Sequence, residues 1–179
     1  MPPSGRQALP AQRIAAVLDA QLKRPLVERL CKAVVFGVCV FPLIAPPLHL
    51  MIDPLSLGAN PAEHIIRDWG DWSLQLLLMT LAITPLRQAT GWHTLARVRR
   101  MMGLFTCGYA LLHALCYGWL DMGLQWSDIA RDIAKRPFIL MGFLAWALMI
   151  PLAATSFNRA IRALGGARWQ ALHRLVYAL

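Results

Sequence analysis

The residue whose position most strongly suggests chemistry is His113, which lies in the apolar stretch GLFTCGYALLHALCYGWL at residues 103–120. An ionisable ring in so apolar a segment is costly to bury unless it finds a partner. Three uses account for it: a structural hydrogen bond to a neighbouring helix, a proton or ion path, or axial ligation of a haem iron. Taken by itself, the residue leaves all three open.

Small residues near His113 favour the haem interpretation. Gly103, Gly108, Ala110 and Ala114 are all small, and at 3.6 residues per turn positions 103, 110 and 114 fall near one face with His113. Small side chains let a flat macrocycle approach the helix backbone. The same residues would also let two helices pack closely without any cofactor.

A second histidine and a group of arginines are further candidates. His173 lies in ARWQALHRLVYAL, near the start of the last apolar stretch, where a surface histidine is the simplest interpretation. Arg97, Arg99 and Arg100 precede the apolar stretch that contains His113. They either set membrane topology and meet anionic lipid, or form a docking place for a flavin phosphate or a soluble reductase.

The remaining polar residues suggest less chemistry. We interpret His49, His64 and His93 as interfacial or solvated, and we assign no role to His64 or Asp68. The cysteines lie in apolar blocks without a C-x-x-C pair, which predicts small buried hydrophobes rather than a disulfide framework or a zinc site. We find no nucleophile, carboxylate pair or phosphate-binding loop and therefore expect no catalytic site within the chain.

Long apolar blocks must position these residues. The 179 residues are 58% hydrophobic and 15% charged, and the apolar residues are gathered rather than scattered. A helix needs about 20 apolar residues to cross a bilayer core of about 30 Å. Four blocks approach this length, and they lack the polar residue every three or four positions that a soluble bundle would show. The predicted spans are about 30–52, 72–88, 101–120 and 137–157.

The chain ends inside what resembles a further span. Gly165 and Gly166 predict a helix stop, and residues 168–179 predict the start of a fifth span. The fold class expected is therefore an all-α polytopic transmembrane bundle of four spans and the start of a fifth, in a chain that looks truncated at its C-terminus. Residues 1–29 form a tail before the first span, either an amphipathic surface helix or disordered.

Charge distribution predicts the orientation. The net charge of +9 is concentrated in alternate connecting segments, whereas the loop at 53–71 has one basic residue against four acidic ones. This alternation follows the positive-inside rule and places the N-terminus in the cytoplasm. Because the charge serves orientation, we expect a lipid bilayer and not nucleic acid as the partner of the chain.

Four ordered motifs resemble a known family. They are LGANPAEHIIRDWGDWSLQLLLMTLAITPLR, RVRRMMGLFTCGYALLHALCYGWLDMG, RPFILMGFLAWALMIPLAATS and LGGARWQALHRLVYAL. In order and spacing they are similar to the MsrQ (YedZ) family. Its members are haem-binding membrane subunits of the bacterial periplasmic protein-methionine-sulfoxide reductase system, in the ferric reductase-like transmembrane group. The resemblance makes residues 30–179 an incomplete domain of this type.

The resemblance implies cofactors, partners and a location. The family has six spans in the bacterial inner membrane, binds haem b, and is reported to bind FMN. Electrons come from the quinone pool or a cytosolic flavin reductase and pass to a periplasmic molybdenum-cofactor subunit, MsrP. The positions of His113 and His173 match haem-ligand positions of the family. The resemblance implies another family histidine that would lie beyond Leu179, so these two do not form a complete pair at one depth.

The resulting hypothesis is an electron conduit that is entered near Arg97–Arg100 and left through haem near His113. A ferric reductase-like cytochrome would share the cofactor and differ in acceptor. A small transporter would need several ionisable groups along one route, and the spans offer little beyond His113 and Gln75. A structural subunit without cofactor would use His113 for a hydrogen bond alone.

Overall fold

The computed structural model describes residues 25–53, 57–91 and 95–178, together with Ile14, Val17 and Ala20. All regular elements in this part of the chain are helical. In order they are α2 (Pro25–Ile52), α3 (Pro61–Thr90), α4 (Leu95–Cys116), the π-helix η2 (Tyr117–Asp121), α5 (Trp126–Lys135), α6 (Pro137–Ala154), α7 (Asn158–Leu164), α8 (Gly166–His173) and the 3-10 helix η3 (Arg174–Ala178).

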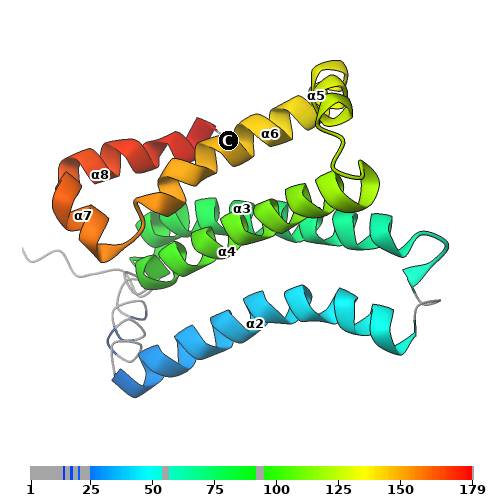
Figure 1. The fold of residues 1–179 in the computed structure, drawn as a ribbon. Coiled ribbons are helices and arrows are strands. Elements are labelled where there is room, and N and C mark those ends of the chain that lie inside the picture. The colour runs from blue at the N-terminus through cyan, green and yellow to red at the C-terminus, as the bar shows by residue number, and fades with distance from the viewer. Residues whose placement is uncertain are drawn as a thin grey trace, which may run out of the picture.

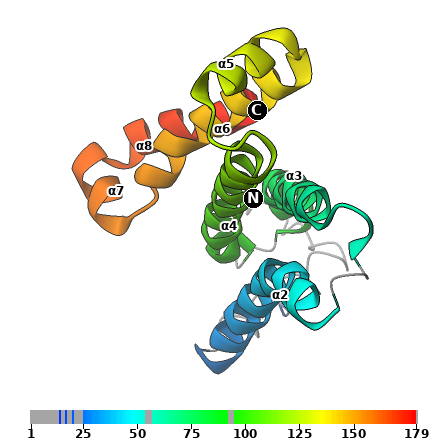
Figure 2. The ribbon, with the colours of Figure 1, turned by 45° about the vertical axis from the view of Figure 1, so that its right-hand side comes forward.

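The antiparallel pair of α3 and α4 is the centre of the fold. These two helices share more contacts than any other pair, while α2 packs on one side of them and α6 packs against α4 on the other (Figures 1 and 2). Buried side chains hold α2 to the pair. They are Cys39, Ile65, Trp69, Leu76 and Tyr109.

Hydrogen bonds between helices accompany this apolar core. The Tyr109 hydroxyl donates to the Cys39 carbonyl at 2.7 Å and so joins α4 to α2. The Ser73 hydroxyl donates to the Thr106 carbonyl at 3.2 Å and joins α3 to α4. Such bonds satisfy polar groups that would otherwise be left unpaired in an apolar surrounding.

Three helices of the described part are long and apolar enough to cross a membrane. They cover Pro25–Ile52, Val98–Asp121 and Pro137–Ala154. Their large apolar side chains point outward, as Phe41 (72% exposed) and Phe138 (70%) illustrate. Such a surface suits lipid and would be a liability in water. The predicted all-α transmembrane class is therefore confirmed.

The second predicted span, 72–88, lies within α3, which is not one of these three helices. α3 has 30 residues, but its apolar stretch is short and contains Gln75, Thr80 and Thr84. Two of its polar side chains, Ser73 and Thr80, are buried and hydrogen-bonded to backbone carbonyls. That α3 also crosses the membrane stays a prediction.

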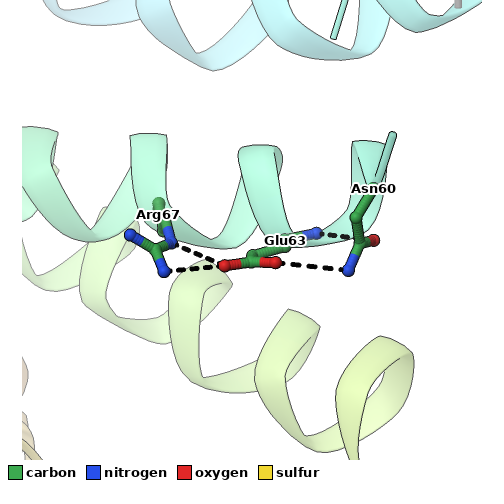
Figure 3. A network of polar contacts seen from close by, with 3 residues as sticks. All are labelled: Asn60, Glu63 and Arg67. Carbon is green, nitrogen blue, oxygen red and sulfur yellow. Dashed lines mark hydrogen bonds and ion pairs between the residues drawn. The ribbon is translucent and has the colours of Figure 1, made fainter. Parts of the chain in front are cut away.

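Helix boundaries differ from the sequence-based ones. α2 begins at Pro25 rather than Leu30, and α3 begins at Pro61, within the predicted loop 53–71. The start of α3 is fixed by Asn60, whose side chain accepts a hydrogen bond from the Glu63 backbone N–H at 3.3 Å (Figure 3). Glu63 also forms an ion pair with Arg67 at 2.7 Å one turn later (Figure 3).

Residues 121–136, which lie between the third and fourth predicted spans, are also largely helical. The last turn of the α4 segment widens into η2, and the short helix α5 follows. Asp132 on α5 accepts a hydrogen bond from the Tyr117 hydroxyl at 2.7 Å and forms an ion pair with Arg136 at 2.8 Å. The bond from Tyr117 holds α5 against the end of the α4 segment, and the ion pair lies at the end of α5 itself.

The C-terminal part turns at Gly165 as expected. This glycine has φ +75°, a conformation that L side chains rarely adopt, and it separates α7 from α8. In Figure 1, α8 runs back beside α6. The helix begins at Gly166, two residues before the predicted start, and its last residues tighten into the 3-10 helix η3.

Candidate functional site

His113 is held by α3 through its Nδ1 atom. Nδ1 lies 2.7 Å from the carbonyl oxygen of Ile66. Because a carbonyl oxygen can only accept, Nδ1 carries the hydrogen and the Nε2 lone pair remains available. This is the arrangement typical of metal-ligating histidines, whose second ring nitrogen donates to a backbone carbonyl or a carboxylate.

Gly70 provides the space for this imidazole. A Cβ added at Gly70 would lie 2.9 Å from His113 Nδ1 and 3.0 Å from Cε1. Any side chain at position 70 would therefore displace the ring or push α3 away from α4. The close approach of α3 fixes the position of His113, and the hydrogen bond to Ile66 fixes its tautomer.

A second candidate site is a cavity of about 490 Å³ among α3, α4, α6 and the C-terminal segment. Its volume falls in the range of about 300–1,000 Å³ that is common for cofactor sites. His173 lines it together with arginines from α3 and α4, and small residues form part of its wall. The small residues are Gly103, Ala153 and Ser156.

His173 is oriented by α6 and by its own helix. Its Nε2 atom lies 3.3 Å from the Thr155 hydroxyl oxygen, and its ring lies 4.1 Å from the ring of Trp169. The Trp169 ring N–H donates to the Thr155 carbonyl at 2.9 Å. The 3.3 Å contact is at the long end for a hydrogen bond, so Nε2 can exchange it for another partner at modest cost.

Arginines make one end of this cavity positive. Arg87, Arg99 and Arg100 all line it, and no acidic residue does so among the described side chains. Arg100 Nη1 also donates to Asn158 Oδ1 at 2.7 Å. Guanidinium groups beside an imidazole and apolar walls fit a planar cofactor that carries carboxylates or a phosphate.

The structure brings some predicted residues together and separates others. His173, Arg99 and Arg100 meet at one cavity. Arg97 lies in the first turn of α4, and its side chain is outside the described part. His113 does not line this cavity, and its place 13 residues beyond Arg100 corresponds to about 20 Å along the helix. The candidate residues therefore belong to two separate sites, which lie at different levels along α4.

Sequence reasoning missed three residues of these sites. Arg87 joins the arginine group from the end of α3, Thr155 contacts His173, and Gly70 accommodates His113. Arg87 closes the stretch ITPLR, so its charge was a visible signal. Gly70 and Thr155 gave no signal, because their roles depend on helices that are distant in sequence.

Comparison with known proteins finds relatives over most of the chain. Residues 69–179 match the family described as "Ferric reductase like transmembrane component". The "Protein-methionine-sulfoxide reductase heme-binding subunit MsrQ" of Polaromonas naphthalenivorans (strain CJ2) is 53% identical over 154 residues, which are 86% of this chain and 69% of the relative. No solved structure matches the chain.

Two further relatives carry the same name. The subunit of Azospira oryzae is 51% identical over 148 residues, which are 83% of this chain and 63% of the relative. The subunit of Herminiimonas arsenicoxydans is 48% identical over 150 residues, 84% of this chain and 68% of the relative. These identities confirm the resemblance carried by the four sequence motifs. The chain belongs to the MsrQ family, within the ferric reductase-like transmembrane components.

Proposed function

We propose that this protein is a haem b-containing membrane subunit that transfers electrons to a methionine sulfoxide reductase. The observation that carries the proposal is His113, because its Nδ1–H is committed to the Ile66 carbonyl and its Nε2 is left for a metal. The relatives are named heme-binding subunits of a protein-methionine-sulfoxide reductase, which supports haem as the cofactor and the same enzyme system.

Two residues are proposed as axial ligands to haem iron. His113 would serve a site toward the η2 end of α4, and His173 would serve the cavity at the arginine end. Bound haem would supply one-electron transfer. The protein residues would fix the ring orientation, exclude water and neutralise the carboxylates of the macrocycle.

The arginines would bind the acidic groups of the cofactor. Arg99 and Arg100, with Arg87, form a cationic end that suits carboxylates. The phosphate of FMN would suit the same end, so FMN is a second cofactor proposed for this cavity by resemblance. Arg97, one turn before Arg100, would extend the charge toward a docking reductase.

Donor, acceptor and location are proposed from the family resemblance. Electrons would come from the quinone pool or a cytosolic flavin reductase and would leave toward a periplasmic MsrP-like molybdenum-cofactor subunit. The chain would lie in the bacterial inner membrane with its N-terminus in the cytoplasm, as the charge distribution favours. The chain would act as the donor subunit, and the partner would repair oxidised methionine residues.

Visible spectra of the purified chain, oxidised and dithionite-reduced, test this proposal. We expect a reduced b-type spectrum in the wild type, its loss in His113→Ala, and a partial loss in His173→Ala. His93→Ala is the matched control, because the sequence assigns His93 no ligand role. A colourless wild type, or unchanged spectra in both ligand variants, would contradict the proposal in favour of a cofactor-free structural subunit.

A ferric reductase-like cytochrome is the second candidate function. The match of residues 69–179 to the ferric reductase-like family favours it, because that match does not specify an acceptor. The reduced protein discriminates the two functions. Reoxidation by ferric chelates but not by a periplasmic methionine sulfoxide reductase subunit would select the second function.

A further inference from the structure

A groove outside both candidate haem sites lies between α2 and α3, with a volume of about 200 Å³. Its polar side chains are His49 on α2 with His64 and Asp68 on α3, and its apolar wall includes Phe41, Pro46 and Trp72. Each of the three polar residues can accept a proton. None of them makes a side-chain hydrogen bond or an ion pair within the described part of the chain.

The groove lies at one end of a predicted membrane span. His49 is near the last residue of α2, Ile52, and His64 is in the first turns of α3. Phe41 at its edge is 72% exposed, on a helix apolar enough to cross a membrane. A molecule dissolved in the lipid can therefore enter the groove from its apolar side. The polar end of the groove lies at the level of the membrane surface.

Prolines interrupt the backbone hydrogen bonds of α2 beside the groove. Pro42, Pro46 and Pro47 lie inside α2, and proline has no N–H to donate. The carbonyls four residues earlier, those of Val38, Pro42 and Leu43, therefore lack their helical partners. Pro42 and Pro46 both line the groove, so its α2 wall belongs to a stretch of helix in which regular backbone hydrogen bonds are missing.

Burial makes Asp68 a better proton acceptor. Asp68 precedes the predicted span 72–88, and partial burial raises the pKa of its carboxyl group. The positive field of His64 lowers this pKa, and the carboxylate of Asp71 raises it, with a net increase. A carboxylate of raised pKa binds a proton more readily at neutral pH.

The lining excludes two other kinds of ligand. No arginine or lysine lines the groove, so it lacks the charge that a flavin or lipid phosphate would need. No group of three metal-ligating side chains occurs among the described residues, so His49, His64 and Asp68 are not placed to hold a metal ion. An uncharged ring with hydroxyl donors and an apolar tail fits both sides of the groove.

We propose that this groove binds the head group of a membrane quinol, with His49, His64 and Asp68 as acceptors of its hydroxyl protons. The inference rests on the proposed electron-transfer function. Oxidation of one quinol to quinone releases two electrons and two protons. The protons would go to the acceptors of the groove, and a haem held by His113 would take up the two electrons one at a time.

The position of α3 supports this route. Ile66 and Gly70, which contact His113, lie on nearly the opposite side of α3 from His64 and Asp68, at 100° per residue. The groove and the His113 imidazole are thus at the same level and separated by about one helix diameter, which is about 10 Å. The cavity that contains His173 is farther away along α4.

Photolabelling of the full chain in lipid nanodiscs tests the site directly. The probe is an azido-substituted ubiquinone with a short tail, and the labelled peptides are identified by mass spectrometry. We expect label at 41–49 and 64–72 and a decrease of about tenfold in Ala45→Phe, which fills the groove. Ala33→Phe is the matched control, because Ala33 is exposed on the same helix and outside the groove.

A second pair of variants keeps the shape of the groove. Asp68→Asn is expected to slow haem reduction by quinol about tenfold while the haem spectrum stays unchanged, and Asp71→Asn is expected to slow it much less. Label that survives Ala45→Phe, or that falls on the cavity of α4 and α6, would overturn the quinol site. Absence of haem in the same samples would overturn the proposed function instead, because labelling does not require haem.

Discussion

At the scale of single residues, the structure explains how a histidine is made ready for a ligand in an apolar surrounding. His113 gives its Nδ1–H to Ile66 and faces Gly70, where no side chain competes for space. The sequence predicted a partner on a neighbouring helix as one of three uses of this residue. The structure adds that such a hydrogen bond and a ligand role are compatible, because they use different ring nitrogens.

Gly70→Ala should disturb His113 specifically. The new Cβ would lie 2.9 Å from Nδ1, closer than real Cβ contacts, so the ring or the helix must shift. Overpacking of this kind costs about 1–3 kcal/mol. We expect a lower thermal midpoint and a loss or shift of the haem spectrum, measured by thermal scans and visible spectroscopy.

Gly142→Ala is the control for this variant. Gly142 lies inside α6, and an added Cβ would meet nothing within 4 Å. Both spectrum and stability should stay close to those of the wild type. Equal behaviour of the two glycine variants would show that the close approach at Gly70 is unimportant.

At the scale of elements, the predicted helical type is confirmed, and several helices extend beyond the limits of the predicted spans. The apolar blocks identified α2, α4 and α6, because long lipid-exposed helices consist almost entirely of apolar residues. α3 begins 11 residues before the predicted span 72–88, because its first turns are polar and the span was predicted from apolar residues. The cap by Asn60 and Pro61 and the Glu63 side chain were local signals of its true start, but they lay outside the apolar window.

Other elements were beyond sequence reasoning. η2 interrupts an apolar helix at Tyr117, where the hydroxyl reaches Asp132 on α5, and this contact spans 15 residues. The arginine group beside His173 likewise joins α3, α4 and α8. Periodicity describes one helix at a time, so it predicts which residues are candidates but not which of them meet.

Tyr109→Phe tests the polar contact between α4 and α2. The Tyr109 hydroxyl is buried and donates to the Cys39 carbonyl at 2.7 Å, so its removal leaves a buried acceptor without its donor. We expect a loss of about 0.5–1.5 kcal/mol in the free energy of unfolding, measured by denaturation in mixed detergent micelles.

Tyr109→Ala should cost more than Tyr109→Phe, because the ring is also part of the apolar core. A loss of about 3–5 kcal/mol is typical of a large aromatic side chain replaced by alanine. If Tyr109→Phe were as stable as the wild type and only Tyr109→Ala were destabilised, packing alone would join the two helices.

At the scale of the whole molecule, orientation is the main prediction that remains. Basic residues are concentrated before α2, near the α3–α4 connection and around α7 and α8, whereas the α2–α3 connection and the first turns of α3 are mainly acidic. This pattern predicts cytoplasmic and periplasmic sides that alternate along the chain. The cavity with His173 would then face the cytoplasm, and the His113 end of α4 would face the periplasm.

Single cysteines at exposed positions test this orientation. In a chain without its native cysteines, a membrane-impermeant maleimide added to intact cells should label Ala59→Cys and Gln125→Cys. It should label Ala163→Cys only after lysis. All three positions are exposed. Ala59 and Gln125 lie on the predicted periplasmic side, and Ala163 lies on the predicted cytoplasmic side. Labelling of Ala163→Cys in intact cells would reverse the orientation. The cavity with His173 would then face the periplasm, and the His113 end of α4 would face the cytoplasm.

The contacts that orient His113 also have a consequence for biosynthesis. Its partners Ile66 and Gly70, and the nearby bond from Ser73 to Thr106, all belong to the hairpin of α3 and α4. During translation this hairpin is complete before α6 and α8 leave the ribosome, and early segments of a chain can fold first. The imidazole can therefore be set in its working tautomer on a nascent chain, before the rest of the bundle exists.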